Sequence, residues 1–158
     1  MKATIHTNSI EETLSLGEKL GARLAAGDVI ALFGDLGAGK TTLTKGIAQG
    51  MNLSDDIHSP TFTLIHEHPG AIPLYHIDLY RLAHEEEVEG IGIEEYIYGD
   101  GVTIIEWADR MKTMLPEGRL DIELKMRGDT EREMTFETDS PRLSLVIEEL
   151  INDADNSN

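Results

Sequence analysis

One segment of eight residues constrains the fold of this chain more than any other feature. Residues Gly34–Thr41 read G-D-L-G-A-G-K-T, which is a complete G-x-x-x-x-G-K-[ST] pattern. An apolar run at Val29–Phe33 precedes it and is typical of a strand that is covered on both faces. A helical pattern begins at Lys40. Because a strand, a glycine-rich turn and a helix occur in this order, we predict a loop that holds the phosphates of a nucleotide.

The positions of this loop have distinct expected roles. Its glycines allow the backbone to curl so that N–H groups point inward, and the start of the helix adds partial positive charge. Lys40 is expected to reach the β and γ phosphates, and Thr41 is expected to ligate Mg²⁺. We therefore predict that the nucleotide is bound by Gly34, Asp35, Leu36, Gly37, Ala38, Gly39, Lys40, Thr41 and Thr42.

Two acidic residues are candidates for a partner of this loop. Enzymes with such a loop need a carboxylate for the metal or the attacking water, usually at the end of a strand beside the loop strand. The apolar runs Leu74–Asp78 and Val102–Glu106 each end in a carboxylate. Ligands of open α/β sheets collect at this end of the strands. Both Asp78 and Glu106 therefore qualify as the Walker B acid, and the pattern does not choose between them.

Other polar and aromatic residues give weaker signals. The hydroxyls of Ser59–Leu64 suit a switch loop that senses a γ-phosphate, although a loop entering a strand has the same composition. His66 and His68 share one face of a strand, but without cysteine or a nearby acid cluster we do not expect zinc. Trp107 is expected to be a core aromatic residue.

The rest of the chain alternates short apolar runs with amphipathic stretches, as α/β proteins do. Further strands are expected at Lys2–Thr7, Thr61–Glu67, Leu120–Arg127 and Glu133–Thr138. Helices are expected from the capping box Ser9/Glu12 to near Gly27, from Lys40 to near Gly50, and from Ser140–Pro141 to about Ile151.

These elements predict a single-domain P-loop NTPase, in which helices flank a mixed and mainly parallel central sheet. The domain is expected to span residues 1–151, and residues 152–158 are expected to form a disordered acidic tail.

Composition limits the partners of such a domain. The sequence has 30 acidic and 13 basic residues, a net charge of −17, which repels phosphate backbones. We do not expect tight, unaided binding to nucleic acid. There is no cysteine, which excludes a disulfide framework and a thiolate nucleophile. No stretch approaches the roughly 18 apolar residues of a membrane span, and no apolar leader opens the sequence, so no membrane association and a cytosolic protein are expected.

Four segments in a fixed order resemble one known family. They are Gly34–Thr42, Ser59–Phe62, His76–Leu82 and Ile105–Ala108. Together they resemble the small bacterial ATPases of the TsaE family, also called YjeE, which serve the biosynthesis of threonylcarbamoyladenosine in tRNA. The resemblance spans nearly the whole chain and implies that ATP, ADP and Mg²⁺ are the ligands.

The resemblance also implies roles for single residues. It places Thr41 and Glu106 at Mg²⁺ and makes Asp78 necessary for hydrolysis, so that both acids have a role. It implies a switch-like role for Thr61, and nucleotide contacts from Thr7 and Arg132. The expected catalytic residues are then Lys40, Thr61, Asp78 and Glu106.

The family resemblance further implies two partners, the proteins TsaD and TsaB. Hydrolysis is expected to be slow in the isolated chain and faster with partners, with Arg81 and Arg110 turned toward a partner. A small-molecule or nucleotide kinase, with these two arginines clamping phosphates, is the alternative function. A GTP-binding switch is disfavoured because the guanine-reading N-K-x-D string is absent, and a purely structural role for the nucleotide stays open.

Overall fold

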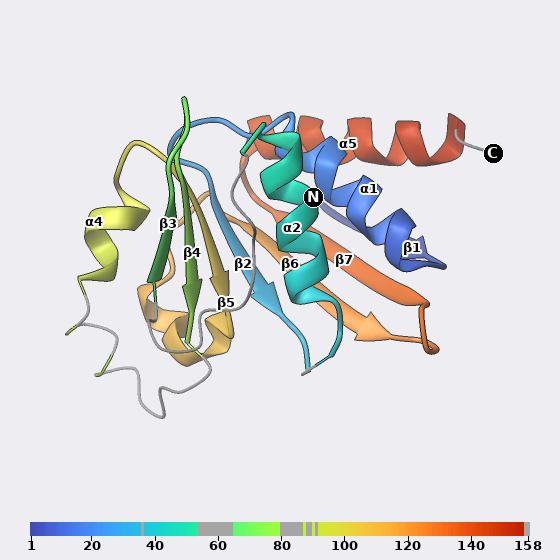
Figure 1. Ribbon diagram of the computed structural model, residues 1–158, viewed down its shortest axis with the longest axis horizontal. Coiled ribbons are helices and arrows are strands. Elements are labelled where there is room, and N and C mark those ends of the chain that lie inside the picture. The colour runs from blue at the N-terminus through green and yellow to red at the C-terminus, as the bar shows by residue number, and fades with distance from the viewer. Residues whose placement is uncertain (36, 54–64, 80–86, 88–89, 91, 157–158) are drawn as a thin grey trace.

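The computed structural model describes residues 1–35, 37–53, 65–79, 87, 90 and 92–156, with the backbone alone at 110, 112 and 156. Its elements (Figure 1) are β1 (Lys2–Thr7), α1 (Ile10–Gly21), β2 (Val29–Phe33), α2 (Lys40–Gly50), β3 (Ile65–His68), β4 (Leu74–Asp78), α4 (Ile93–Ile97), β5 (Val102–Glu106), the 3-10 helix η1 (Ala108–Met114), β6 (Leu120–Met126), β7 (Arg132–Thr138) and α5 (Pro141–Asn156). None of the helices in these ranges is long and apolar enough to cross a bilayer.

The strands form one mixed sheet in the order β1-β7-β6-β2-β5-β4-β3. The pairs β6·β2, β2·β5 and β5·β4 are parallel, whereas β1·β7, β7·β6 and β4·β3 are antiparallel. The predicted α/β fold with a mixed sheet is confirmed. Parallel pairing is confined to the middle of the sheet, because hairpins supply strands at both sides.

The parallel centre determines where the site lies. The strands β2, β5 and β4 run in the same direction, so their carboxyl ends meet at the lower edge of the sheet in Figure 1. The register sets Leu32 of β2 beside Glu106 of β5, and Glu106 beside Asp78 of β4. The loop after β2 and the two candidate acids therefore share one edge.

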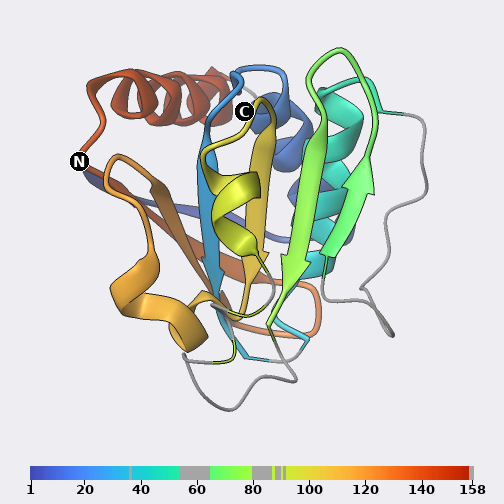
Figure 2. The ribbon, with the colours of Figure 1, turned by 90° about the vertical axis from the view of Figure 1, so that its left-hand side faces the viewer.

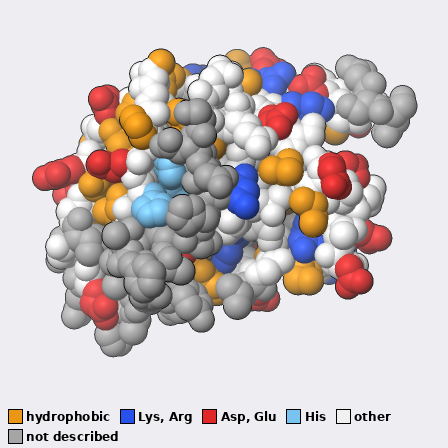
Figure 3. Space-filling model, in the orientation of Figure 1, with side chains coloured by type: hydrophobic (Ala, Val, Ile, Leu, Met, Phe, Trp, Pro, Cys, Tyr) orange, Lys and Arg blue, Asp and Glu red, His pale blue; other side chains and the backbone are white. Residues whose placement is uncertain are grey.

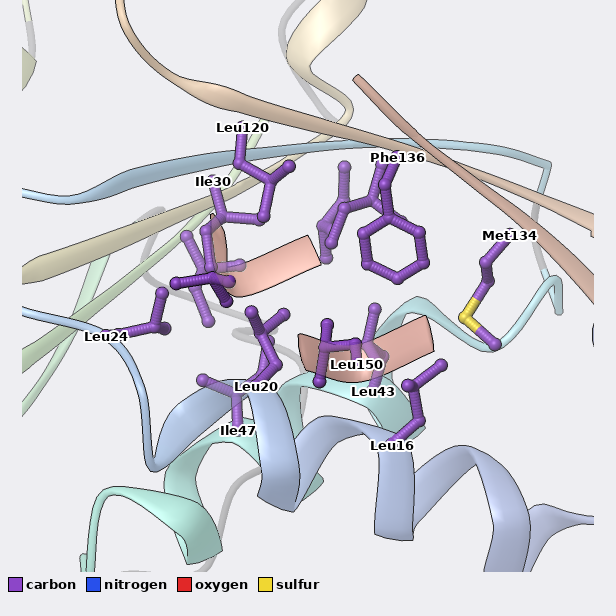
Figure 4. Packing of buried hydrophobic residues seen from close by; sticks show 14 of the residues in the cluster. Leu16, Leu20, Leu24, Ile30, Leu43, Ile47, Leu120, Met134, Phe136 and Leu150 are labelled. Carbon is purple, nitrogen blue, oxygen red and sulfur yellow. The ribbon is translucent and has the colours of Figure 1, made fainter. Parts of the chain in front are cut away.

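Both faces of β2 are buried, as its continuous apolar run predicts. Ile30 and Leu32 belong to a core cluster with α1, α2 and α5, part of which Figure 4 shows. Val29 and Ala31 belong to a second cluster with α4 and η1. Figure 2 shows the helices of the two clusters on opposite faces of the sheet, with α4 and η1 on the face toward the viewer and α1 and α2 behind it.

Glycines bring α1 and α2 unusually close together. A Cβ atom on Gly17 would lie 2.7 Å from the Leu43 carbonyl oxygen, and one on Gly21 would overlap the Ile47 carbonyl group. Real Cβ atoms do not approach backbone this closely, so only glycine allows the two helices this separation. The contact fixes α2, and with it the loop that precedes α2.

Two helix ends differ from the sequence-based expectation. The predicted disordered tail is wrong for residues 152–156, because α5 continues to Asn156. Arg23 contacts this end of α5: its guanidinium pairs with Glu149 at 2.7 Å and with Asp153 at 2.8 Å. The helix α1 ends at Gly21 rather than near Gly27.

Candidate nucleotide-binding site

The loop between β2 and α2 has the backbone that its glycines make possible. Gly39 caps α2 with a φ of 104°, a left-handed conformation that other residues rarely adopt. A Cβ atom on Gly34 would lie 2.7 Å from the Leu124 carbonyl oxygen. Between these two glycines, Asp35 is exposed and Ala38 is buried. Leu36, one of the predicted contacts, lies outside the described residues.

Lys40 is buried within this loop. Its side chain is only 5% exposed, and its Nζ donates a hydrogen bond of 2.6 Å to the Gly34 carbonyl oxygen. Burial lowers the pKa of Lys40, and the negative charges of Glu106 and then Asp78 oppose this shift. Lys40 is thus a desolvated cation that lies within the electrostatic influence of both predicted acids.

Trp107 is the aromatic partner of this cation. Its ring centroid lies 3.6 Å from the Lys40 Nζ, the geometry of a cation–π contact. The residue has a φ of 59°, which is uncommon for a bulky side chain. The ring also packs against the second core cluster, so the expectation of a core aromatic holds only in part. Its contact with Lys40 was not apparent from the sequence.

The two acids differ in exposure although they are neighbours in register. Glu106 is 3% exposed, whereas Asp78 is half-buried. His76, which is fully buried on β4, makes a short hydrogen-bonded contact from Nε2 to Glu106 Oε2. The sequence reasoning gave His76 no role. Its position two residues before Asp78, on the same face of the strand, was the signal that could have found it.

Arg132 and Thr7 occupy adjacent strands near the loop. The two are register partners on β7 and β1. One guanidinium nitrogen of Arg132 donates to the Gly37 carbonyl oxygen at 3.3 Å, so Arg132 lies against the loop, and its nucleotide contact stays a prediction. The Thr7 hydroxyl is 2.7 Å from the Thr13 hydroxyl and is buried. The side chain of Thr7 is therefore committed to α1.

The remaining predicted residues are only partly described. Thr41 and Thr42 lie in the first turn of α2 and are both half-buried. Thr61 lies outside the described residues, together with the rest of Ser59–Leu64 and Arg81. The side chain of Arg110 is not described either.

A pocket of about 500 Å³ opens beside the loop. Gly34, Asp35 and Ala38 form its loop side, and Trp107 and Asp109 line the side that follows β5. The end of β6 and the residue after it, residues 123–127, line another side. The loop therefore borders a concave surface large enough for part of a small ligand.

The oxygen atoms at this edge suit a Mg²⁺ ion that is also bound by water and phosphate. They do not form a metal site made of protein ligands alone. Among the described residues, no group of three or more His, Asp or Glu side chains is placed to hold a metal ion. Mg²⁺ instead prefers one or two carboxylates together with water and phosphate oxygens. Glu106, Asp78 and the Thr41 hydroxyl are side chains of that kind beside a phosphate-type loop.

The comparisons with known proteins agree with this geometry. The family model described as "Threonylcarbamoyl adenosine biosynthesis protein TsaE" matches residues 7–134. The chain belongs to the TsaE family. A TsaE protein of Bacillus subtilis (strain 168) is 47% identical over 141 residues, which are 89% of this chain and 88% of that protein. A TsaE protein of Treponema pallidum is 43% identical over 82% of this chain and 96% of its own length.

A solved structure shares the fold of this chain. The crystal structure of YdiB from Bacillus subtilis superposes with a TM-score of 0.83 at 39% sequence identity, covering 98% of this chain and 97% of that chain. Membership of the TsaE family assigns the chain to the biosynthesis of threonylcarbamoyladenosine in tRNA.

Proposed function

We propose that this chain binds ATP with Mg²⁺ at the loop 34–41, hydrolyses it, and thereby supports threonylcarbamoyladenosine modification of tRNA by acting on a complex of TsaD and TsaB. The observation that carries the proposal is the buried Lys40, which lies in the loop and is influenced by both Glu106 and Asp78. A desolvated cation at a helix N-terminus is a strong site for phosphate oxygens.

The loop supplies the phosphate contacts in this proposal. Lys40 donates to the Gly34 carbonyl oxygen, and a phosphate oxygen would replace this acceptor when ATP binds. The N–H groups of the loop and the start of α2 add further donors. Arg132, which touches the Gly37 carbonyl group, brings a second positive charge to the rim of the loop.

Glu106 and Asp78 have different roles in this proposal. Thr41 and Glu106 would hold Mg²⁺, directly or through water, and the ion would neutralise charge on the β and γ phosphates. Asp78 would orient the water that attacks the γ phosphorus. Water adds to phosphorus, the bond to the bridging oxygen breaks, and ADP and inorganic phosphate leave.

The proposal includes a partner because the described site has few cations. Among the described residues, Lys40 and Arg132 are the basic side chains that hydrogen-bond to the loop, whereas Lys125 and Arg127 line the pocket beside it. An arginine supplied by a partner can add roughly 10³ to 10⁵ in rate. The net charge of −17, with acidic side chains on both sides of the face in Figure 3, suits a basic partner surface. Such a complex would act in the cytoplasm on tRNA.

The test is phosphate release by the chain alone, with TsaD, with TsaB and with both, at low and high salt. We expect slow hydrolysis alone and stimulation by the pair, which weakens at high salt because exposed charges are screened. Full activity that partners do not change would contradict the partner role. Transfer of the γ-phosphoryl group to a small acceptor, with no release to water, would contradict the ATPase and favour the kinase.

A further inference from the structure

His76 is a buried histidine whose described polar contact is with Glu106. It lies on β4, is fully buried, and approaches Glu106 Oε2 of β5 with its Nε2 atom. A carboxylate oxygen accepts hydrogen bonds, so we assign the proton in this contact to Nε2, which donates to Glu106 Oε2.

The second ring nitrogen indicates that packing alone does not explain this histidine. Among the described residues, Nδ1 is buried without a hydrogen-bond partner. Leu74 and Ile104, which lie on the same face, belong to the apolar core cluster. An apolar side chain would fill this position without burying an unpaired polar atom, which costs free energy. Compared with an apolar side chain, the imidazole provides the contact with Glu106.

We propose that His76 is a positioning residue for Glu106: its Nε2–H group holds Oε2, which fixes the carboxylate and leaves the second oxygen for Mg²⁺. The inference rests on the proposed function, in which Glu106 serves the metal. Residues that orient a metal ligand from behind typically contribute 10- to 100-fold to metal affinity or activity. No step of the reaction passes through His76 itself.

Two amide variants test the direction of this hydrogen bond. In His76→Gln the side-chain amide nitrogen reaches close to the position of Nε2, whereas in His76→Asn it lies near the position of Nδ1. Both variants keep a polar side chain at the same buried site. Only the glutamine variant is expected to keep a donor to Glu106.

The measurement is calorimetric titration with a non-hydrolysable ATP analogue, once with Mg²⁺ and once with EDTA. The quantity of interest is the ratio of the two dissociation constants, which is the gain in affinity due to Mg²⁺. We expect His76→Asn to reduce this gain at least about tenfold and His76→Gln to keep most of it. The affinity in EDTA is expected to be the same in both variants as in the wild type.

His6→Asn is the matched control. His6 also forms a histidine–glutamate pair, with Glu133 at 3.4 Å, but its side chain is 63% exposed and lies on β1. The same substitution there is expected to leave the gain unchanged, so that any effect at His76 is specific to its place beside Glu106.

Each outcome decides between distinct claims. A wild type without any gain from Mg²⁺ would contradict the proposed metal site. A wild-type gain that both His76 variants retain would overturn the positioning role alone. Equal losses with Mg²⁺ and with EDTA would show that His76 only holds β4 against β5, which also overturns it. If His76→Asn does not fold, His76→Leu takes its place as the variant without a donor: a tenfold loss of the gain there with retention in His76→Gln supports the proposal, and retention in both overturns it.

Discussion

The strands β2, β5 and β4, which pair in parallel, and the strands β1, β7 and β6, which pair antiparallel with one another, belong to one sheet. The environments of their charged side chains differ. In the parallel centre, His76 and Glu106 are buried and contact each other, and the charge of Glu106 acts on Lys40 in the loop. On the antiparallel side, pairs such as Arg127–Glu133 stay partly exposed, with side-chain exposures of 54% and 21%.

The difference follows from the connections of the strands. Parallel strands are linked by crossovers that cover both faces, so a charge at their carboxyl ends is desolvated and must find a specific partner. The hairpin strands leave one side open to water, where ion pairs contribute little. We infer that charges in the centre serve function and that charges on the antiparallel side, apart from Arg132 at the loop, serve solubility. The predictions below test this contrast.

The largest effect is expected at Asp78 in the parallel centre. Asp78→Asn keeps the size of the side chain but removes the charge that would orient the attacking water, so hydrolysis should fall by roughly 10²- to 10⁴-fold with ATP affinity retained. Phosphate release and calorimetry measure the two quantities. The control is Asp121→Asn on β6, where the carboxylate pairs with Arg119 at 2.8 Å and should not affect hydrolysis. An equal loss of hydrolysis in Asp78→Asn and Asp121→Asn would contradict the functional difference between the parallel centre and the antiparallel side.

A smaller effect is expected at the helices that cover the centre. Gly21→Ala would force a methyl group into the Ile47 carbonyl group, so unfolding should become easier by about 1–3 kcal/mol. Gly128→Ala in the hairpin between β6 and β7 meets only the side chain of Glu131, at 3.4 Å, and should change stability by less than about 0.5 kcal/mol. Urea unfolding measures both. If Gly21→Ala leaves the free energy of unfolding unchanged, the contact between α1 and α2 does not fix α2.

The smallest effect is expected on the antiparallel side and depends on pH. A hydrogen bond from Arg127 lowers the pKa of Glu133, partial burial opposes this shift, and His6 adds to it. Because the folded pKa is lowered, the stabilisation is present above the unfolded pKa and is lost as the pH falls through the folded value. Arg127→Ala should therefore flatten the decrease in stability between about pH 6 and pH 3.

Urea midpoints across this pH range would measure the effect, with Lys125→Ala as the control for a more loosely paired cation, 3.6 Å from Glu123. High salt should weaken the difference. An effect as large as that of Gly21→Ala would contradict the view that the exposed pairs contribute little.

Local patterns predicted the elements of the parallel centre well. The runs Val29–Phe33, Leu74–Asp78 and Val102–Glu106 are strands with the expected bounds, because continuous apolar residues mark strands that are covered on both faces. The loop follows β2 and opens α2 as its motif requires. These features depend on sequence neighbours alone.

Long-range contacts account for what the sequence did not predict. The order of the strands, which puts Glu106 between Leu32 and Asp78, arises from tertiary pairing. The end of α5 is contacted by Arg23, which is 126 and 130 residues away from its partners. The contact of Trp107 with Lys40 similarly joins two separate connections of the sheet.

The central claim is tested most directly by calorimetric titration of Mg²⁺ and ATP into the wild type and into Lys40→Ala. Loss of the charged hydrogen bond should weaken binding by roughly 1.5–3 kcal/mol, about 10- to 150-fold, with the fold intact. Lys45→Ala, at an exposed lysine of the same helix α2, should bind as the wild type does. Unchanged affinity in Lys40→Ala would contradict the account, because the buried cation of the loop would then not bind phosphate.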